Sequence, residues 1–125
     1  MTRFLRTEPL IPELEQIGFK VKDAGLLSAA LGRSAATVFG QDAYPTIWDK
    51  AAALFDSVIK NHAMFDGNKR TAWIAVNAFL QLNGFRLRAD TESAFEFVIG
   101  VAEKRLDLPA VANWLDRHST PLQFN

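Results

Sequence analysis

The chain contains no cysteine among its 125 residues. Disulfide bonds, zinc sites built from thiolates and cysteine nucleophiles are therefore excluded, and a reducing compartment suits the sequence. The chain also lacks net charge, because 14 basic residues balance 14 acidic ones. No sequence-wide positive field draws in nucleic acid, which argues against direct nucleic-acid binding.

Long apolar runs are missing as well. The amino terminus, MTRFLRTEPLIPELEQ, has no uninterrupted apolar stretch of signal-peptide length, and no other run approaches the length of a membrane span. We therefore expect a cytoplasmic protein without a membrane partner. With 49% hydrophobic and 22% charged residues, the composition is typical of a globular chain, and the length suits one domain, residues 1–125.

Hydrophobic spacing after residue 23 is helical, with apolar side chains recurring at three- and four-residue intervals. Residues that favour helix starts precede four of these runs: Asp23, Thr46, Thr91 and Asp107. The first helix is expected to resume its stripe at Val38 and Phe39 before GQDAYP breaks it, and Asp49 offers a capping box to the second. A fifth helix, residues 68–83, ends at Gly84.

Two segments depart from this helical spacing. Pro9 and Pro12 limit the leader, residues 1–22, to a short helix near residues 13–17. The alternation of FRLRAD, residues 85–90, predicts a short strand or hairpin arm. The sequence therefore predicts an all-α domain of five or six helices with a short extended segment.

Polar chemistry gathers in one stretch, HAMFDGNKR, between two helical runs. Gly67 and Asn68 precede a strong helix, whose first free N–H groups and dipole favour an anion. Lys69 and Arg70 in the first turn are unfavourable near the positive end of a helix unless an anion is bound there. A phosphate is the anion that this arrangement suits best.

A base and a metal ligand stand beside this anion cradle. Asp66 suits Mg²⁺, which bridges carboxylates to phosphate oxygens, and His62 suits a general base near neutral pH. Taken alone, each residue has a plainer explanation: His62 packs or caps, Asp66 is an N-cap, and Lys69 and Arg70 form a solvated face. Their joint spacing favours phosphoryl or nucleotidyl transfer to a hydroxyl. His118, in the polar tail, is expected to be solvated.

The stretch HAMFDGNKR resembles the signature of the Fic/Doc superfamily, HxFx[DE]GN[GK]R, and is most similar to the death-on-curing (Doc) branch. Residues 23–118 look family-like, whereas the leader diverges. The resemblance implies an all-helical Fic (Fido) fold and ATP with Mg²⁺ as cofactors. It also implies the following roles: His62 deprotonates a target hydroxyl, Asp66 holds Mg²⁺, Gly67 and Asn68 cradle the anion, and Lys69 and Arg70 contact the phosphates.

Departures from the pattern refine what the resemblance implies. Met64 replaces the usual phenylalanine that anchors the loop in the core. Lys69 replaces the small residue of AMP-transferring members, and Trp73 replaces their second arginine; both favour transfer of the γ-phosphate, as in Doc-like members. The resemblance also implies that Gly40–Thr46 is the flap against which the backbone of the target lies.

The resemblance implies partners too. None of the six glutamates follows the inhibitory pattern [ST]xxxE[GN], so an antitoxin protein in trans is expected to restrain the chain. The expected function is that of a toxin and kinase acting on a Ser or Thr hydroxyl of a target protein, such as the translation factor elongation factor Tu. Two alternatives stay open: an AMP transferase, and a non-catalytic antitoxin-binding protein.

Overall fold

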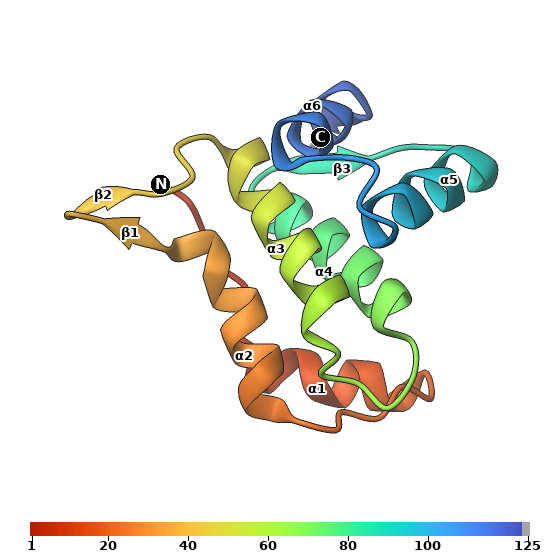
Figure 1. Ribbon diagram of the computed structural model, residues 1–125. Coiled ribbons are helices and arrows are strands. Elements are labelled where there is room, and N and C mark those ends of the chain that lie inside the picture. The colour runs from red at the N-terminus through yellow and green to blue at the C-terminus, as the bar shows by residue number, and fades with distance from the viewer. Residues whose placement is uncertain (124–125) are drawn as a thin grey trace.

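The computed structural model describes residues 1–123, which form a bundle of helices with two short antiparallel strand pairs (Figure 1). The helices are α1 Thr7–Gln16, α2 Ala24–Gly32, α3 Ile47–Asn61, α4 Asn68–Leu82, α5 Thr91–Ala102 and α6 Leu108–Arg117. The strands are β1 Thr37–Val38, β2 Gln41–Asp42, β3 Phe85–Leu87 and β4 Ser119–Pro121. This confirms the predicted all-α class. None of the helices in the described part has both the length and the apolar character that crossing a membrane requires.

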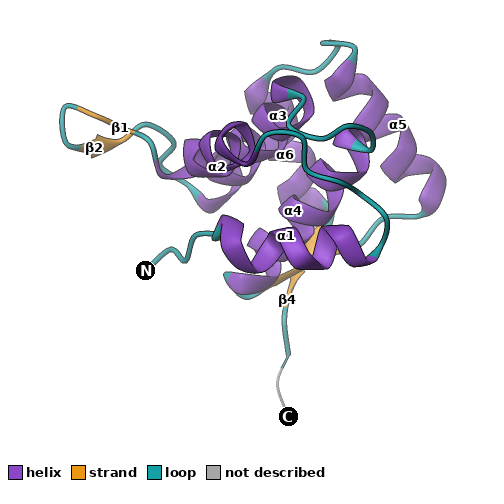
Figure 2. Cartoon of the chain, turned by 90° about the horizontal axis from the view of Figure 1, so that it is seen from below, coloured by secondary structure: helices purple, strands orange, loops and turns teal. Residues whose placement is uncertain are grey.

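Helix α3 is the centre of the bundle, with α2, α4 and α6 packed around it (Figures 1 and 2). Ten consecutive residues starting at Lys50 are buried, so this helix is covered on all sides. Its buried charges are paired: Lys50 contacts Asp42 at 3.0 Å, and Asp56 contacts both Arg33 at 3.1 Å and Lys60 at 2.6 Å. Pairing is what allows charged groups to lie this deep.

Side-chain caps explain why the helices begin where the sequence predicts. Four helices have an N-cap side chain that accepts a backbone hydrogen bond from the first turn: Asp23, Thr46, Asp90 and Asp107. Thr91 opens α5 as predicted, but the capping side chain is that of Asp90, one residue earlier. The predicted capping box is present, because Asp49 N–H donates to Thr46 Oγ1 at 3.0 Å and Thr46 N–H donates to Asp49 Oδ2 at 3.4 Å.

The leader is more helical than the prolines suggest. The prediction of a short helix near residues 13–17 is wrong, since α1 begins well before it and contains both prolines. Pro9 lies in the first turn, where a backbone N–H has no intrahelical partner to lose. Pro12 does give up one hydrogen bond, and burial of Leu10 and Leu14 against the core offsets that loss.

The helix after Asp23 does not resume at Val38 and Phe39, as the stripe predicts. These residues belong to the β1–β2 hairpin, whose two-residue loop is Phe39 and Gly40. Both loop residues have positive φ, 51° and 79°, as a tight hairpin turn of this length requires. Phe39 is consequently fully exposed at the tip rather than buried in a helix stripe.

The carboxyl-terminal part closes the bundle. The predicted strand is present as β3, and β4 pairs with it in antiparallel fashion. The expectation that His118 is solvated is wrong: it is half-buried, its ring stacks on Trp114 at 3.8 Å, and its Nδ1 lies 2.8 Å from the Trp114 carbonyl oxygen. The stack continues from Trp114 through Phe97 to Phe55, so packing between helices decides the position of His118.

Candidate active site

The loop between α3 and α4 brings the predicted site residues together (Figure 1). All six line one cavity of about 670 Å³: His62, Asp66, Gly67, Asn68, Lys69 and Arg70. Three further polar or aromatic residues on the same wall were not predicted as site residues: Lys60, Phe65 and Lys104. The residues that the sequence grouped within nine positions therefore lie together on one concave surface.

His62 ends α3 in the left-handed conformation, with φ 51° and ψ 46°. This conformation turns the chain sharply and leaves the side chain at the cavity rather than in the core. The imidazole is exposed and makes no hydrogen bond within residues 1–123. The explanation of His62 as a packing residue is therefore wrong, whereas the alternative that it caps a helix agrees with its place at the C-cap of α3.

No side chain among the described residues caps the N-terminus of α4. Its N-cap is Gly67, with φ 79°, and the backbone N–H groups of Asn68, Lys69 and Arg70 have no acceptor among the described residues. Asp66 lies one residue before the N-cap, where it accepts the Gly67 N–H at 2.8 Å, so its explanation as an N-cap is also wrong. Three free donors at the positive end of a 15-residue helix make a ready anion site.

The Asn68 side chain makes its hydrogen bonds within the loop rather than being free to bind an anion. Its side chain accepts the Met64 N–H at 3.1 Å and donates to the Met64 carbonyl oxygen at 3.4 Å. The amide is thus used inside the loop, and the backbone N–H of Asn68 is what remains for an anion. Met64 itself is 1% exposed, which confirms that it anchors the loop in the core.

A leader segment, Gly18–Asp23, lies directly beside this loop. Val21 forms an isolated antiparallel bridge with Met64. Lys22 N–H donates to Ala63 O at 2.8 Å, and Phe65 N–H donates to Lys20 O at 3.1 Å. We call Gly18–Asp23 the edge segment, because one side of it pairs with the loop.

The assignment of the flap to Gly40–Thr46 is wrong, because the segment that lies beside the loop is the edge segment. That loop lies at the opposite end of α3 from His62 (Figure 1). A helix of 15 residues is about 22 Å long, so the loop does not reach the cavity. The alternation of Phe19 and Val21 with two lysines is the signal that could have identified the edge segment.

The charge of the cavity is strongly positive. Lys69, Arg70 and Lys104 have no acidic partner in the described part of the chain, whereas Lys60 is paired with Asp56 at 2.6 Å. Asp66 is the one carboxylate that residues 1–123 place on the wall. Uncompensated cations of this kind attract a polyanion.

The residues present also limit how a metal could be held. Within residues 1–123, no three His, Asp or Glu side chains are grouped to bind a metal ion by themselves. Asp66 would contribute one ligand, and phosphate oxygens and water would complete the coordination. Mg²⁺ commonly binds in this way, so the site fits a metal that arrives with a nucleotide.

A second, apolar cavity of about 420 Å³ adjoins the first, because Lys69 and Arg70 line both. Its other walls come from α4 and α5: Trp73, Thr91, Ala94, Phe95, Val98 and Ile99. This places Trp73 next to Lys69 and Arg70, and it packs edge-on against Trp114 at 6.3 Å.

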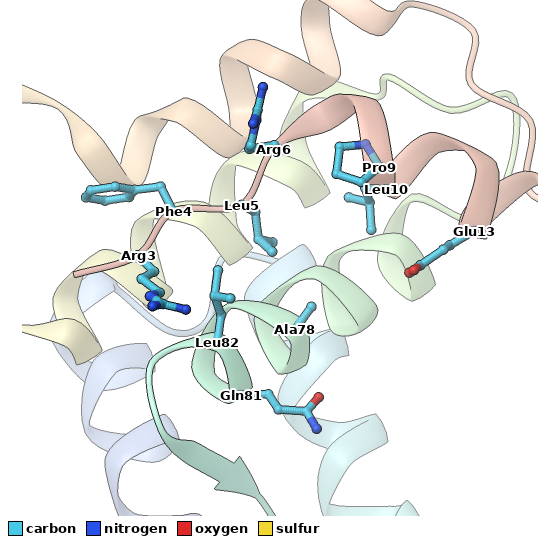
Figure 3. Close-up of a pocket in the computed structure, with 10 residues that line it drawn as sticks. All are labelled: Arg3, Phe4, Leu5, Arg6, Pro9, Leu10, Glu13, Ala78, Gln81 and Leu82. Carbon is cyan, nitrogen blue, oxygen red and sulfur yellow. The ribbon is translucent and has the colours of Figure 1, made fainter. Parts of the chain in front are cut away.

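A larger cavity, about 780 Å³, lies between the amino-terminal segment, α1 and the end of α4 (Figure 3). Leu5, Leu10 and Leu82 form its apolar lining, and Arg3 and Arg6 stand at its edge. It contains no histidine. Chemistry, rather than size, therefore identifies the cavity at the loop as the candidate active site.

Comparison with known proteins agrees with this geometry. A family model described as the Fic/DOC family matches residues 5–80, which include the loop, the edge segment and most of the leader. A protein named Toxin Doc, from Mycolicibacterium smegmatis (strain ATCC 700084 / mc(2)155), is 53% identical over 95 residues. That alignment covers 74% of this chain and 73% of the relative.

Proposed function

Because this chain belongs to the Fic/DOC family, and within it to the Doc branch, we propose that it is the cytoplasmic toxin of a toxin–antitoxin pair and a protein kinase. Its reaction is transfer of the γ-phosphate of ATP to a Ser or Thr hydroxyl of a target protein. One observation carries the enzymatic part: the exposed imidazole of His62 and the free N–H groups that open α4 line the same cavity.

The proposed mechanism uses the chain's own residues in fixed places. The phosphates of ATP bind at the N-terminus of α4 with Lys69 and Arg70 beside them. His62 takes the proton from the target hydroxyl as its oxygen attacks the γ-phosphorus. The bond from that phosphorus to the β–γ bridging oxygen breaks, and ADP leaves. Asp66 would hold Mg²⁺, which would neutralise part of the phosphate charge when it is bound.

The edge segment offers a way to hold the target. The N–H and C=O groups of Val21 take no backbone hydrogen bond within residues 1–123, because pairing with the loop uses Lys20 and Lys22 instead. An extended target peptide can add to this free side as another strand. Its hydroxyl would then lie near His62. We propose a translation factor, such as elongation factor Tu, as the target.

Two features support γ-phosphate transfer over AMP transfer. Lys69 occupies the cavity wall where AMP-transferring members have a small residue, and Trp73 stands where they have a second arginine. The six glutamates lack the inhibitory pattern, which supports restraint by an antitoxin in trans.

The test is incubation of the purified chain with cell lysate and ATP labelled at either the α or the γ phosphate. We expect label on protein from γ alone. Label from α indicates AMP transfer, and no label from either indicates a binding protein. His62→Ala should abolish the signal with an unchanged helical circular dichroism spectrum, whereas the matched control His118→Phe, which keeps the ring stack on Trp114, should retain it.

A further inference from the structure

Lys104 adopts a backbone conformation that lysine rarely takes. Its φ is 61°, and it is one of three non-glycine residues with positive φ in the described part of the chain; the others are Phe39 and His62. Phe39 lies in the two-residue loop of the β1–β2 hairpin, and His62 lines the candidate active site. For an L-residue with a long side chain this conformation is unfavourable, so something must compensate for it.

The position of Lys104 is one where glycine is the usual residue. The turn after α5 is a Schellman motif: the Lys104 N–H donates to the Val101 carbonyl oxygen at 3.0 Å, and the Arg105 N–H donates to the Gly100 carbonyl oxygen at 2.8 Å. Lys104 therefore stands at the left-handed C′ position. The turn itself needs no ammonium group there, so the fold does not explain the lysine.

The side chain of Lys104 lines the candidate active site, where the end of α5 comes near the start of α4 (Figure 1). It has no acidic partner within residues 1–123, whereas its neighbour Arg105 lies 3.3 Å from Glu103 and does not line the cavity. The cavity therefore has a cation without an acidic partner from a second element, besides Lys69 and Arg70 on α4.

We propose that Lys104 binds the phosphate chain of the nucleotide and makes the cavity selective for polyphosphates over monophosphates. The proposal deepens the proposed function and rests on it for the identity of the nucleotide. Three cations without acidic partners face one carboxylate, Asp66, which is more positive charge than a single phosphate needs. The N-terminus of α4 and the turn after α5 line the same cavity, so we expect a triphosphate bound there to contact both.

The test compares four proteins: wild type, Lys104→Gly, Lys104→Arg and Arg105→Gln. Lys104→Gly removes the ammonium group and is well suited to the turn, so its thermal midpoint should equal or exceed that of wild type. Lys104→Arg keeps a cation in the cavity. Arg105→Gln is the matched control, because it removes a neighbouring cation from outside the cavity.

Calorimetry at fixed ionic strength should give dissociation constants for ATP, inorganic tripolyphosphate and AMP. Lys104→Gly should weaken ATP and tripolyphosphate about tenfold, with AMP changed less than about twofold. Lys104→Arg and Arg105→Gln should stay close to wild type. The proposal is overturned if Lys104→Gly binds ATP and tripolyphosphate as wild type does, if AMP weakens equally, or if wild type binds neither polyphosphate.

The failure of this proposal is distinguishable from failure of the proposed function. Suppose that the wild type transfers label to protein but Lys104→Gly leaves ATP affinity unchanged. That result supports the proposed kinase activity and rejects the proposed role of Lys104. If the wild type binds ATP without transferring any label, the proposed kinase activity is rejected. A tenfold loss of ATP affinity in Lys104→Gly would still support the proposed role of Lys104.

Discussion

The ring of Phe19 lies against the backbone of Gly67, so closely that a β-carbon on Gly67 would stand 2.6 Å from Phe19 Cδ1. Gly67 also has φ 79°, a conformation that side chains rarely adopt. One contact thus joins the edge segment to the residue that begins the anion site. The leader consequently supports the loop that carries the candidate active site, although it lies far from that loop in sequence.

Replacing Gly67 with alanine should therefore destabilise the chain by about 2–4 kcal/mol, from positive-φ strain and from the clash with Phe19. Urea unfolding of Gly67→Ala, Phe19→Ala and the double variant measures the clash, because the penalty of Gly67→Ala should shrink when the ring is removed. Gly84→Ala is the matched control, since Gly84 also has a positive φ, 92°, but a β-carbon there meets nothing within 4 Å. Additive effects of the two substitutions would contradict the contact.

Asn68→Ala should cost about 1–2 kcal/mol of stability, because it removes both hydrogen bonds to the backbone of Met64. Asn61→Ala is a suitable comparison, since the Asn61 side chain donates one long hydrogen bond, 3.5 Å, to Leu26 O and should cost less. Chemical denaturation measures both. Equal, small losses would mean that Asn68 does not hold the loop.

Phe39→Asn should leave phosphoryl transfer unchanged, because the β1–β2 hairpin lies at the other end of α3 from His62 (Figure 1). It should also raise the thermal midpoint slightly, because asparagine tolerates positive φ better than phenylalanine does. Initial rates with a fixed target protein test the first point. A large loss of transfer would restore the hairpin as the flap.

Asp90 should give the stability a measurable acid dependence. The hydrogen bond from the Ser93 N–H, 2.7 Å long, holds the pKa of the Asp90 carboxyl below its usual value of 3.8. Since the folded-state pKa is lowered, the stabilisation is present above pH 3.8 and is lost as the pH falls through the folded-state value. The difference in thermal midpoint between wild type and Asp90→Ala should therefore shrink in that acid range.

Asp90→Asn provides the control for this titration. Asparagine keeps an oxygen that accepts the Ser93 N–H but carries no titrating group there. Its thermal midpoint relative to Asp90→Ala should change less with pH than that of wild type. If the wild-type difference is the same at neutral and strongly acidic pH, the carboxylate is not what stabilises this helix start.

Local signals explain what the sequence could predict. Helix starts at Asp23, Thr46 and Asp107 depend on hydrogen bonds within one turn, so residue type and spacing are enough. The same is true of the start of α4, where Gly67 and the residues after it determine the free N–H groups.

Features that depend on distant neighbours were missed. Val21 of the edge segment pairs with Met64, which lies 43 positions later in the sequence. The residues of the edge segment do not by themselves predict which part of the chain they pair with. His118 is polar and close to the chain end, yet stacking on Trp114 makes it half-buried. Lys104 could not be identified from the sequence, because a single lysine there predicts neither the left-handed turn nor its position beside the cavity. Both become evident only in the structure.

The role of the cavity at the loop is tested most directly by a crystal structure with Mg²⁺ and an ATP analogue whose β–γ bridge cannot be cleaved. We expect phosphate oxygens within hydrogen-bond distance of the N–H groups of Asn68, Lys69 and Arg70, with the His62 imidazole facing the γ-phosphate. Phosphates bound elsewhere, or an imidazole directed away from them, would contradict it.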